Sequence, residues 1–288
     1  MLGEMVLSGG RIPKGDAGGR SSVAGREGGD SIWGAPAPRK TMARVKPWPA
    51  SLNAELKKKG FDLCAPFSTK WYNDEIAEAH LKMKGLPHFG RDAALCYVIG
   101  SNKSVWQYFL RHPPKSAFSD APRNHAGRSA FDAFVEESVF EAIERAKCPP
   151  GLRRHYAFAH AMEHDVAFQR CAGLAALADV DPLTNLCVHP IFGSWVSLRC
   201  VVVFDAPPPA HHPKPVTALL TEEELDGCKA ALERVADGGP GDWKDWLKVR
   251  DAIKRGKSWR FSDSHILYFW QGASRDKALR RALEHQVC

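Results

Sequence analysis

The sequence lacks a long uncharged apolar run, a paired cysteine motif and the common nucleotide-binding loops. None of its 288 residues belongs to a stretch approaching the roughly 18 apolar residues of a membrane helix. Its eight cysteines are scattered without a Cys-x-x-Cys pair, which indicates reduced intracellular thiols and disfavours a structural zinc site. G-x-x-x-x-G-K, G-x-G-x-x-G and G-x-S-x-G motifs are also missing, so nucleoside-triphosphate, Rossmann and serine-hydrolase chemistry lack support.

Positive charge is concentrated at the start of the chain. Residues 1–47 carry eight Lys and Arg against four Asp and Glu, so the rest of the chain carries only +3 of the total +7. The later basic residues form short patches without interleaved aromatic residues. A nucleic-acid-binding surface is therefore not expected.

The composition divides the chain into two parts. Residues 1–47 are rich in Gly, Ser, Arg and Pro without hydrophobic periodicity, which predicts a disordered basic extension. Its Arg bias leaves an organellar transit peptide as the alternative to a cytoplasmic location, and Met42 could be the true start. Residues 48–288 are predicted to form a single globular domain, with a helical and aromatic cap from about residue 207.

The apolar pattern from Leu52 onward favours an α+β fold, since helices and strands alternate without a repeated β-α-β unit. Extended structure is expected at 61–67, 71–72, 93–100 and 201–204. Helices are expected at 104–111, 131–143, 151–177, from the Thr221–Glu224 capping box to about 236, and from about Ser274. The proline-rich segment 206–215 is predicted to be a connector.

The segment from Cys187 to Phe204, CVHPIFGSWVSLRCVVVF, is the most informative stretch of the chain. Val201–Phe204 reads as a strand buried on both faces, preceded by a turn at His189-Pro190 and Gly193. Arg199 then lies at or within a buried strand, where a guanidinium group needs an anionic partner. That partner is either an internal Asp or Glu or the carboxylate of a ligand.

Two later clusters combine aromatic and basic residues: Trp243–Asp251, and Tyr268–Trp270 with Arg275. Trp and Tyr provide large apolar surfaces, and arginine provides a rigid fork for carboxylates, so the clusters suit the lining of a large, partly apolar site. For each cluster taken alone, an ordinary surface helix whose Trp residues face the core is the better explanation. Arg199, Arg250 and Arg275 together favour the site.

His160-Ala-Met-Glu163-His164 matches the H-x-x-E-H pattern, in which two imidazoles on one helix face hold zinc and the glutamate acts as a base. Such a peptidase also needs a distant third ligand and a large body around the substrate. A helix rich in histidine produces this pattern by chance, so a zinc hydrolase is kept only as an alternative.

The segment 187–204 resembles the Cys-x-His-Pro-x-Phe-Gly-x-Trp block, followed by Arg-x-Val-Val, of the cblC-type cobalamin-processing proteins, the MMACHC family. Order and spacing hold from about Leu52 to Leu279. The supporting matches are Gly60-Phe61, Pro66-Phe67, Trp71-Tyr-Asn73, His160, Phe168-Gln169-Arg170, Asp245-Trp246, Arg250-Asp251 and Tyr268-Phe269.

The resemblance implies a fold similar to the flavin-dependent nitroreductases, with a mainly antiparallel central sheet flanked by helices and a large cofactor cavity. It implies intracellular vitamin B12 processing and trafficking, in which cobalamin is bound with its lower base detached and loses its upper ligand. Family members are alkylcobalamin dealkylases, which use glutathione, and cyanocobalamin reductases, which remove cyanide with reduced FMN or FAD. A cobalamin carrier without catalytic activity is the nearest alternative.

The resemblance also implies roles for individual residues. Arg199, Arg250 and Arg275 match glutathione-binding arginines of the family, and no catalytic residue or protein metal ligand is assigned. The positions matching the cobalamin-binding wall are Arg153, Arg154, His155, Tyr156, His160, Ala167, Phe168, Gln169, Cys187 and Leu198. Asp263-Ser-His265 begins like a cobalt-ligating Asp-x-His motif, but Tyr268 stands where that motif has Gly, so the match is treated as chance.

The partners that the resemblance implies are cobalamin, glutathione, a flavin, a cblD-type adaptor protein and a flavin reductase. The chain is expected to be a monomer or a weak homodimer without a membrane span.

Overall fold

The computed structural model describes residues 47–114, 129–161, 166–237 and 243–270. Among these residues, five α-helices and six strands occur up to residue 204, and further helices follow. The helices and strands are α1 (Trp48–Lys58), β1 (Leu63–Ser68), α2 (Thr69–Glu78), β2 (Leu95–Ser101), α3 (Ser104–Arg111), α4 (Ala130–Arg145), β3 (Arg154–Phe158), α5 (Phe168–Leu174), β4 (Asp179–Val180), β5 (Cys187–Val188), β6 (Ser197–Phe204), α6 (Glu222–Asp237), α7 (Trp243–Ala252), η2 (Lys257–Trp259) and α8 (Asp263–Trp270).

The central sheet has four strands in the order β1-β2-β6-β3, and all of its neighbouring strands are antiparallel. Strands β4 and β5 form a separate antiparallel pair. Every residue of β2 is buried, as are Cys200–Phe204 of β6, which fits two inner strands covered on both faces. The predicted α+β class with an antiparallel sheet flanked by helices is confirmed.

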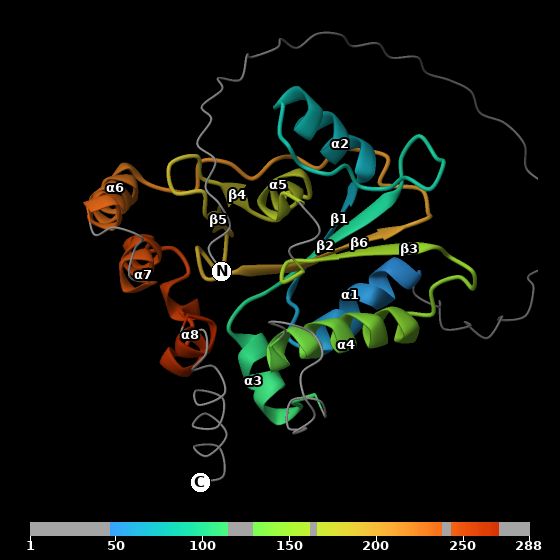
Figure 1. The fold of residues 1–288 in the computed structure, drawn as a ribbon, viewed down its shortest axis with the longest axis horizontal. Helices are drawn as coiled ribbons and strands as arrows, with labels where there is room; N and C mark the ends of the chain where they lie inside the picture. The colour runs from blue at the N-terminus through green and yellow to red at the C-terminus, as the bar shows by residue number, and fades with distance from the viewer. Residues whose placement is uncertain (1–46, 115–128, 162–165, 238–242, 271–288) are drawn as a thin grey trace, which may run out of the picture. The chain divides into compact units, whose positions relative to one another are not determined.

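Helices cover both faces of the sheet (Figure 1). Helices α1, α3 and α4 lie on one face, where aromatic residues such as Trp106, Phe109 and Phe134 pack against Tyr97 and Phe204. Helices α2 and α5 lie on the other face, over a core of smaller side chains from β2 and β6. Arg199 contacts Phe131 on the face with the larger aromatic core.

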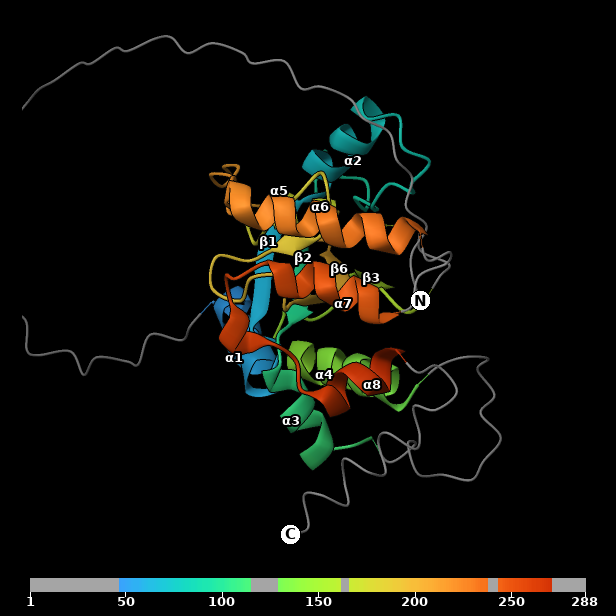
Figure 2. The same ribbon diagram turned by 90° about the vertical axis from the view of Figure 1, so that its left-hand side faces the viewer.

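Helices α6, α7 and α8 follow the last strand of the sheet in the chain. Figure 2 shows α6 and α7 side by side, and their contact buries Cys228, Ala231, Val249 and Ile253. Helix α8 is attached to the aromatic face of the sheet by hydrogen bonds from the Trp106 indole to the Ser264 hydroxyl, 3.2 Å, and from the Phe131 amide to the Tyr268 hydroxyl.

Two secondary-structure predictions are wrong. The helix expected over 151–177 is instead strand β3, a loop and the short helix α5, because β3 fills the outer position beside β6 and tertiary pairing outweighs a helix-like spacing of apolar residues. Trp71 and Tyr72, expected to be extended, lie in α2. Ser68 ends β1 and caps that helix by accepting a hydrogen bond from the Lys70 amide.

Other predictions are confirmed. Helix α3 has the predicted bounds, and α6 begins at the predicted capping box, where the Thr221 and Glu224 side chains each accept a hydrogen bond from the other's amide. The connector 206–215 has no helix or strand. The helix expected from Ser274 lies outside the described residues.

In the described part of the chain, no helix is long and apolar enough to cross a membrane. The cysteines there are unpaired.

Candidate functional site

Arg199 is the extra residue of a β-bulge in β6. Ile99 of β2 pairs with Cys200, but the next residue, Gly100, pairs with Leu198, so Arg199 has no partner in the register. A bulge bends its strand and re-aims the side chain at that point. Leu198 therefore packs with the core on the α5 face, while Arg199 contacts Phe131 of α4 on the opposite face.

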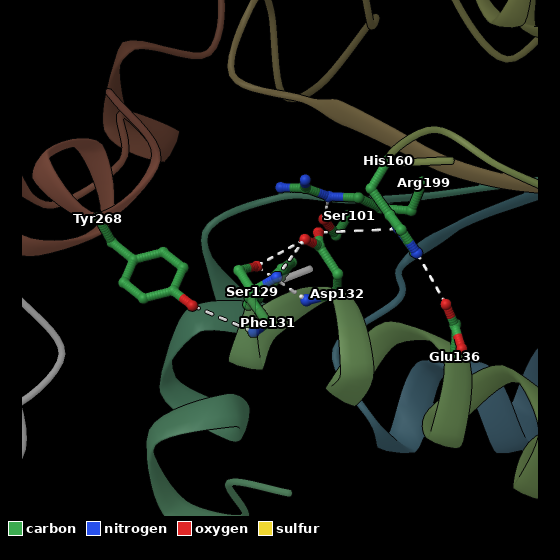
Figure 3. A network of polar contacts seen from close by, with 8 residues as sticks. All are labelled: Ser101, Ser129, Phe131, Asp132, Glu136, His160, Arg199 and Tyr268. Carbon is green, nitrogen blue, oxygen red and sulfur yellow. Dashed lines mark hydrogen bonds and ion pairs between the residues drawn. The ribbon is translucent and has the colours of Figure 1, made fainter. Parts of the chain in front are cut away.

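The Arg199 guanidinium group is held by aromatic rings. Its Cζ atom lies 4.8 Å from the ring centroid of Phe131 and 4.7 Å from that of Phe269. Its Nε atom lies 3.5 Å from the Ser101 hydroxyl (Figure 3). Burial lowers the pKa of Arg199 to about 10, while the Asp132 carboxylate acts in the opposite direction. The group thus stays cationic at neutral pH, and no described residue accepts a hydrogen bond from its terminal nitrogens.

Arg250 is the second largely buried guanidinium group. It extends from α7 to the turn before β6, where its Nη1 donates to the Ser194 carbonyl at 2.6 Å and its Cζ lies 5.9 Å from the Trp195 ring. The Ser194 hydroxyl donates in return to the Arg250 carbonyl. Burial lowers the pKa of Arg250 as well.

These two residues, hereafter the arginine pair, lie close enough for the charge of Arg250 to lower the pKa of Arg199. Among the residues that the structure describes, no carboxylate forms an ion pair with either member. Asp132 is the acidic group whose charge acts on Arg199, and its Oδ2 is already engaged by the Ser129 amide and hydroxyl. Two partly buried cations without a paired carboxylate in the described part of the chain suit an anionic ligand.

His160 is linked to Arg199 by Asp132, which lies close to the His160 ring and whose charge acts on Arg199. It follows β3, and its Nε2 contacts the Glu136 carboxylate at 2.8 Å, while its Nδ1 lies 3.7 Å from Asp132 Oδ1 (Figure 3). The two acidic residues come from successive turns of α4, so this helix orients both the imidazole and the arginine environment. His160 thus belongs to the polar network beside the arginine pair.

The apolar residues matched to a cobalamin wall lie on the other face. Ala167, Phe168 and Leu198 pack against one core cluster there, and Leu198 also packs with Cys187 in the neighbouring cluster. Burial raises the pKa of Cys187 to about 12, which leaves the thiol protonated and unsuited to act as a nucleophile. Gln169 is exposed, and its side-chain amide donates to the Asn185 carbonyl.

Arg153 to Tyr156 lie at the opposite end of β3 from His160. Arg153 donates to the Asp205 carboxylate at 2.9 Å and to the Phe89 carbonyl at 2.7 Å. Arg154 pairs with Phe204, the last residue of β6, while His155 pairs with Val203. Tyr156 stacks against Phe158. The structure therefore does not gather all the predicted cobalamin-binding residues around Arg199.

The structure describes only part of the zinc motif and does not describe the third arginine. Glu163, His164 and Arg275 lie outside the described residues. Within the described ranges, no group of three or more His, Cys, Asp or Glu side chains is arranged to hold a metal ion.

His189 shapes the turn before β6. Its Nδ1 accepts hydrogen bonds from the amides of Ile191 and Phe192, and its backbone pairs with Gly193. Burial lowers its pKa to about 4, which keeps it neutral and able to accept these bonds. The turn packs closely against the loop that contains Arg255. A Cβ atom on Gly193 would lie only 1.8 Å from the Arg255 carbonyl oxygen, so this position requires glycine.

Several site residues were not predicted from the sequence. Phe131 and Ser101 contact Arg199, and Asp132 acts on its charge, whereas Phe269, which also contacts Arg199, belongs to the predicted cluster Tyr268–Trp270. The available signal was the capping box of α4, which places Ser129 and Asp132 at a helix start. The bulge that turns Arg199 toward them leaves no such mark in the sequence.

Comparisons with known proteins bear on the family and the fold of this chain. No protein-family model matches the chain. A curated relative, the cyanocobalamin reductase / alkylcobalamin dealkylase of Mus musculus, is 26% identical over 244 residues, which cover 75% of this chain and 78% of that protein. The solved structure of a C. elegans B12-trafficking protein, CblC, described as a human MMACHC homologue, is similar with a TM-score of 0.61 and 19% identity over 82% of this chain and 96% of that one.

The structural likeness shows a shared fold, and the sequence match extends over three quarters of the chain. Together they confirm the resemblance of this chain to the MMACHC, or cblC-type, family.

Proposed function

We propose that this protein processes cobalamin, and that it removes the upper ligand of alkylcobalamins with glutathione as the acceptor. The names of the mouse and C. elegans relatives support cobalamin as the substrate. The observation that carries the glutathione assignment is the arginine pair, Arg199 and Arg250, which is partly buried and has no paired carboxylate in the described part of the chain. A carrier that only held cobalamin would not need it.

Glutathione fits the arginine pair by charge and by geometry. It carries two carboxylates, and each guanidinium fork binds a carboxylate through parallel hydrogen bonds. Binding both ends of the tripeptide would fix the position of the thiol between them. Arg275 is proposed as the third glutathione-binding arginine from the family resemblance alone.

The thiol then attacks the cobalt-bound carbon as a thiolate. The new sulfur–carbon bond gives an S-alkyl glutathione, and the electron pair of the broken carbon–cobalt bond stays on cobalt. The protein contributes chiefly by orientation and by keeping water away from the reacting groups. The protonated thiol of Cys187 supports a nucleophile that comes from outside the chain.

The cobalamin-binding wall is proposed from the residues that resemble it, with the apolar group Ala167, Phe168, Cys187 and Leu198 as its best-supported part. These side chains share two adjacent core clusters on the α5 face. Reductive removal of cyanide with FMN or FAD, the nitroreductase-like cavity, a cblD-type adaptor, a flavin reductase and a cytoplasmic location belong to the same proposal and rest on the resemblance.

The decisive experiment follows the visible spectrum of methylcobalamin. Wild-type protein should shift the spectrum to the base-off form, and added glutathione should then demethylate it. The R250A variant should give the same base-off shift but lose demethylation. Arg91→Ala provides a matched control, because Arg91 is exposed and pairs with Asp205.

A wild-type spectrum that stays base-on would contradict cobalamin binding. Normal demethylation by R250A would contradict the role of the arginine pair. A base-off shift without demethylation in the wild-type protein would favour the carrier instead.

A further inference from the structure

His265 of α8 is a buried polar residue that the proposed reaction does not yet use. Only 1% of its surface is exposed. Its ring stacks on Trp106, with centroids 5.0 Å apart and planes 6° apart, and on Phe261, with centroids 4.3 Å apart. Two aromatic rings therefore pack against the imidazole, and both of its ring nitrogens are buried as well.

Neither ring nitrogen of His265 has a hydrogen-bond partner among the described residues. An unpaired buried donor and acceptor destabilise a fold, and an apolar ring of the same shape would be better for packing alone. The residue is therefore explained poorly as a core aromatic. The unpaired ring nitrogens instead suggest that a bound ligand supplies the hydrogen-bond partner of His265.

The position of His265 connects it to the arginine pair. Its ring centroid lies 5.2 Å from that of Phe269, the ring that also contacts Arg199. On its other side, Phe261 contacts Trp195, over which Arg250 lies. The imidazole thus stands in a continuous series of ring contacts between the two guanidinium groups.

Burial, and next the charge of Arg199, hold the pKa of His265 well below its usual range. The ring is therefore neutral at neutral pH, with one nitrogen that can accept a hydrogen bond. Arginine supplies donors only, so the arginine pair can bind carboxylates but cannot satisfy a donor on the same ligand.

We propose that His265 is the hydrogen-bond acceptor of the anion site formed by Arg199 and Arg250. It would receive the N–H donor that sits on the carbon next to a carboxylate held by Arg199. Glutathione has such a donor at each end, the ammonium of the γ-glutamyl residue and the amide of the glycine. This inference rests on the proposed function, since it takes glutathione as the ligand.

The test compares the full-length wild-type protein with H265F, which keeps the stacked ring but removes both nitrogens. Isothermal titration calorimetry would measure binding of glutathione and of glutaryl-cysteinylglycine, which keeps both carboxylates and the thiol but lacks the ammonium. H265F should bind glutathione about tenfold more weakly than wild type, the loss expected for one hydrogen bond to a charged group. Its melting temperature should be equal or higher.

The second ligand identifies the donor. If the ammonium is the donor, wild type should prefer glutathione to the glutaryl peptide, and H265F should bind the two alike. If the glycine amide is the donor, H265F should lose the same affinity for both peptides. H265Q, which restores an acceptor oxygen, should recover part of the loss in either case.

Equal glutathione affinity of wild type, H265F and H265Q would overturn the assignment of His265 and leave the proposed function intact. Failure of wild-type protein to bind glutathione would overturn both.

Discussion

Arginine residues occur at both ends of strand β6, and they are satisfied in different ways. At the end of the strand, Arg91 and Arg153 are exposed and share the Asp205 carboxylate. At its beginning, Arg199 is enclosed by aromatic rings, and together with Arg250 it lacks an ion-paired carboxylate in the described part of the chain.

This difference suggests that Arg91 and Arg153 have a structural role, whereas Arg199 and Arg250 bind a ligand. Exposed ion pairs contribute little to stability, because water already solvates both groups. Buried guanidinium groups are costly to keep without a partner, so their retention suggests that an anion arrives from outside. The chain places both kinds around one strand, which allows a matched test of each.

The largest effect is expected for Arg199→Ala against Arg91→Ala. Loss of one side of a buried charge pair costs about 2–5 kcal/mol, so R199A should reduce glutathione-dependent demethylation by roughly 100-fold or more. R91A should stay close to wild type. Single-turnover rates with methylcobalamin check this. Equal rates for the two variants would contradict the ligand-binding role given to Arg199 and not to Arg91.

Gly193→Ala should act through the position of Arg250. Its Cβ would lie 1.8 Å from the Arg255 carbonyl oxygen, in a backbone with φ of +59°. We expect a loss of unfolding free energy of about 3 kcal/mol, together with weaker glutathione binding, because the turn holding Ser194 must move.

Gly151→Ala is the control for this substitution. Gly151 also has positive φ, but a Cβ there would meet no atom within 4 Å. Chemical denaturation of both variants should show the larger loss at Gly193. A larger loss at Gly151 would mean that backbone conformation, and not the close approach of the two loops, dominates.

Arg250→Lys should give a smaller effect on activity, since it keeps the charge but removes the planar fork. The loss of one charge-assisted hydrogen bond predicts roughly a tenfold increase in KM for glutathione, with cobalamin binding unchanged. Steady-state kinetics measure this. If R250K equals R250A, the fork matters more than the charge, and if it equals wild type, charge alone suffices.

The smallest effect is expected for Asp205→Asn. Hydrogen bonds from Arg91 and then Arg153 hold the pKa of Asp205 below its usual value. A lowered folded-state pKa adds stability above the usual carboxyl range, and this stability is lost as pH falls through the lowered pKa. D205N should therefore be slightly less stable than wild type at pH 7, and the difference should shrink in acid.

Urea denaturation at several pH values checks this expectation, with Asp226→Asn as the control for an exposed ion pair within one helix. A difference between D205N and wild type that grows as pH falls would contradict the assigned sign.

The sequence predicted the parts of the fold that depend on local pattern. Ser104–Arg111 and the Thr221–Glu224 capping box are local signals, and both agree with the structure. The run Val201–Phe204 identified a buried strand because its residues are apolar on both faces. The helix prediction for the segment around Tyr156 failed because an outer strand of five residues is too short to distinguish the two-residue period of a strand from the period of a helix.

The site followed the same rule. Arg199 could be singled out because a cation within an apolar run is unusual, and Arg250 because it lies in a cluster of Trp and basic residues; the resemblance then implied a glutathione-binding role for both. The orientation of Arg199 depends on one unpaired residue in the β2–β6 register, and the enclosure of His265 depends on rings from α3 and the segment before α8. Both arise from contacts between residues far apart in the chain.

The close approach of Gly193 to Gly256 also bears on how the protein folds. A Cβ on Gly256 would lie 2.1 Å from the Phe192 backbone, so the two glycines allow the chain to close a long loop that includes α6 and α7. Contacts of such long sequence separation cost chain entropy before they return any stabilisation. The β2–β6 pairing of the central sheet joins residues still farther apart in the chain, so we expect the two glycines to meet, and Arg250 to reach Ser194, no later than this pairing forms.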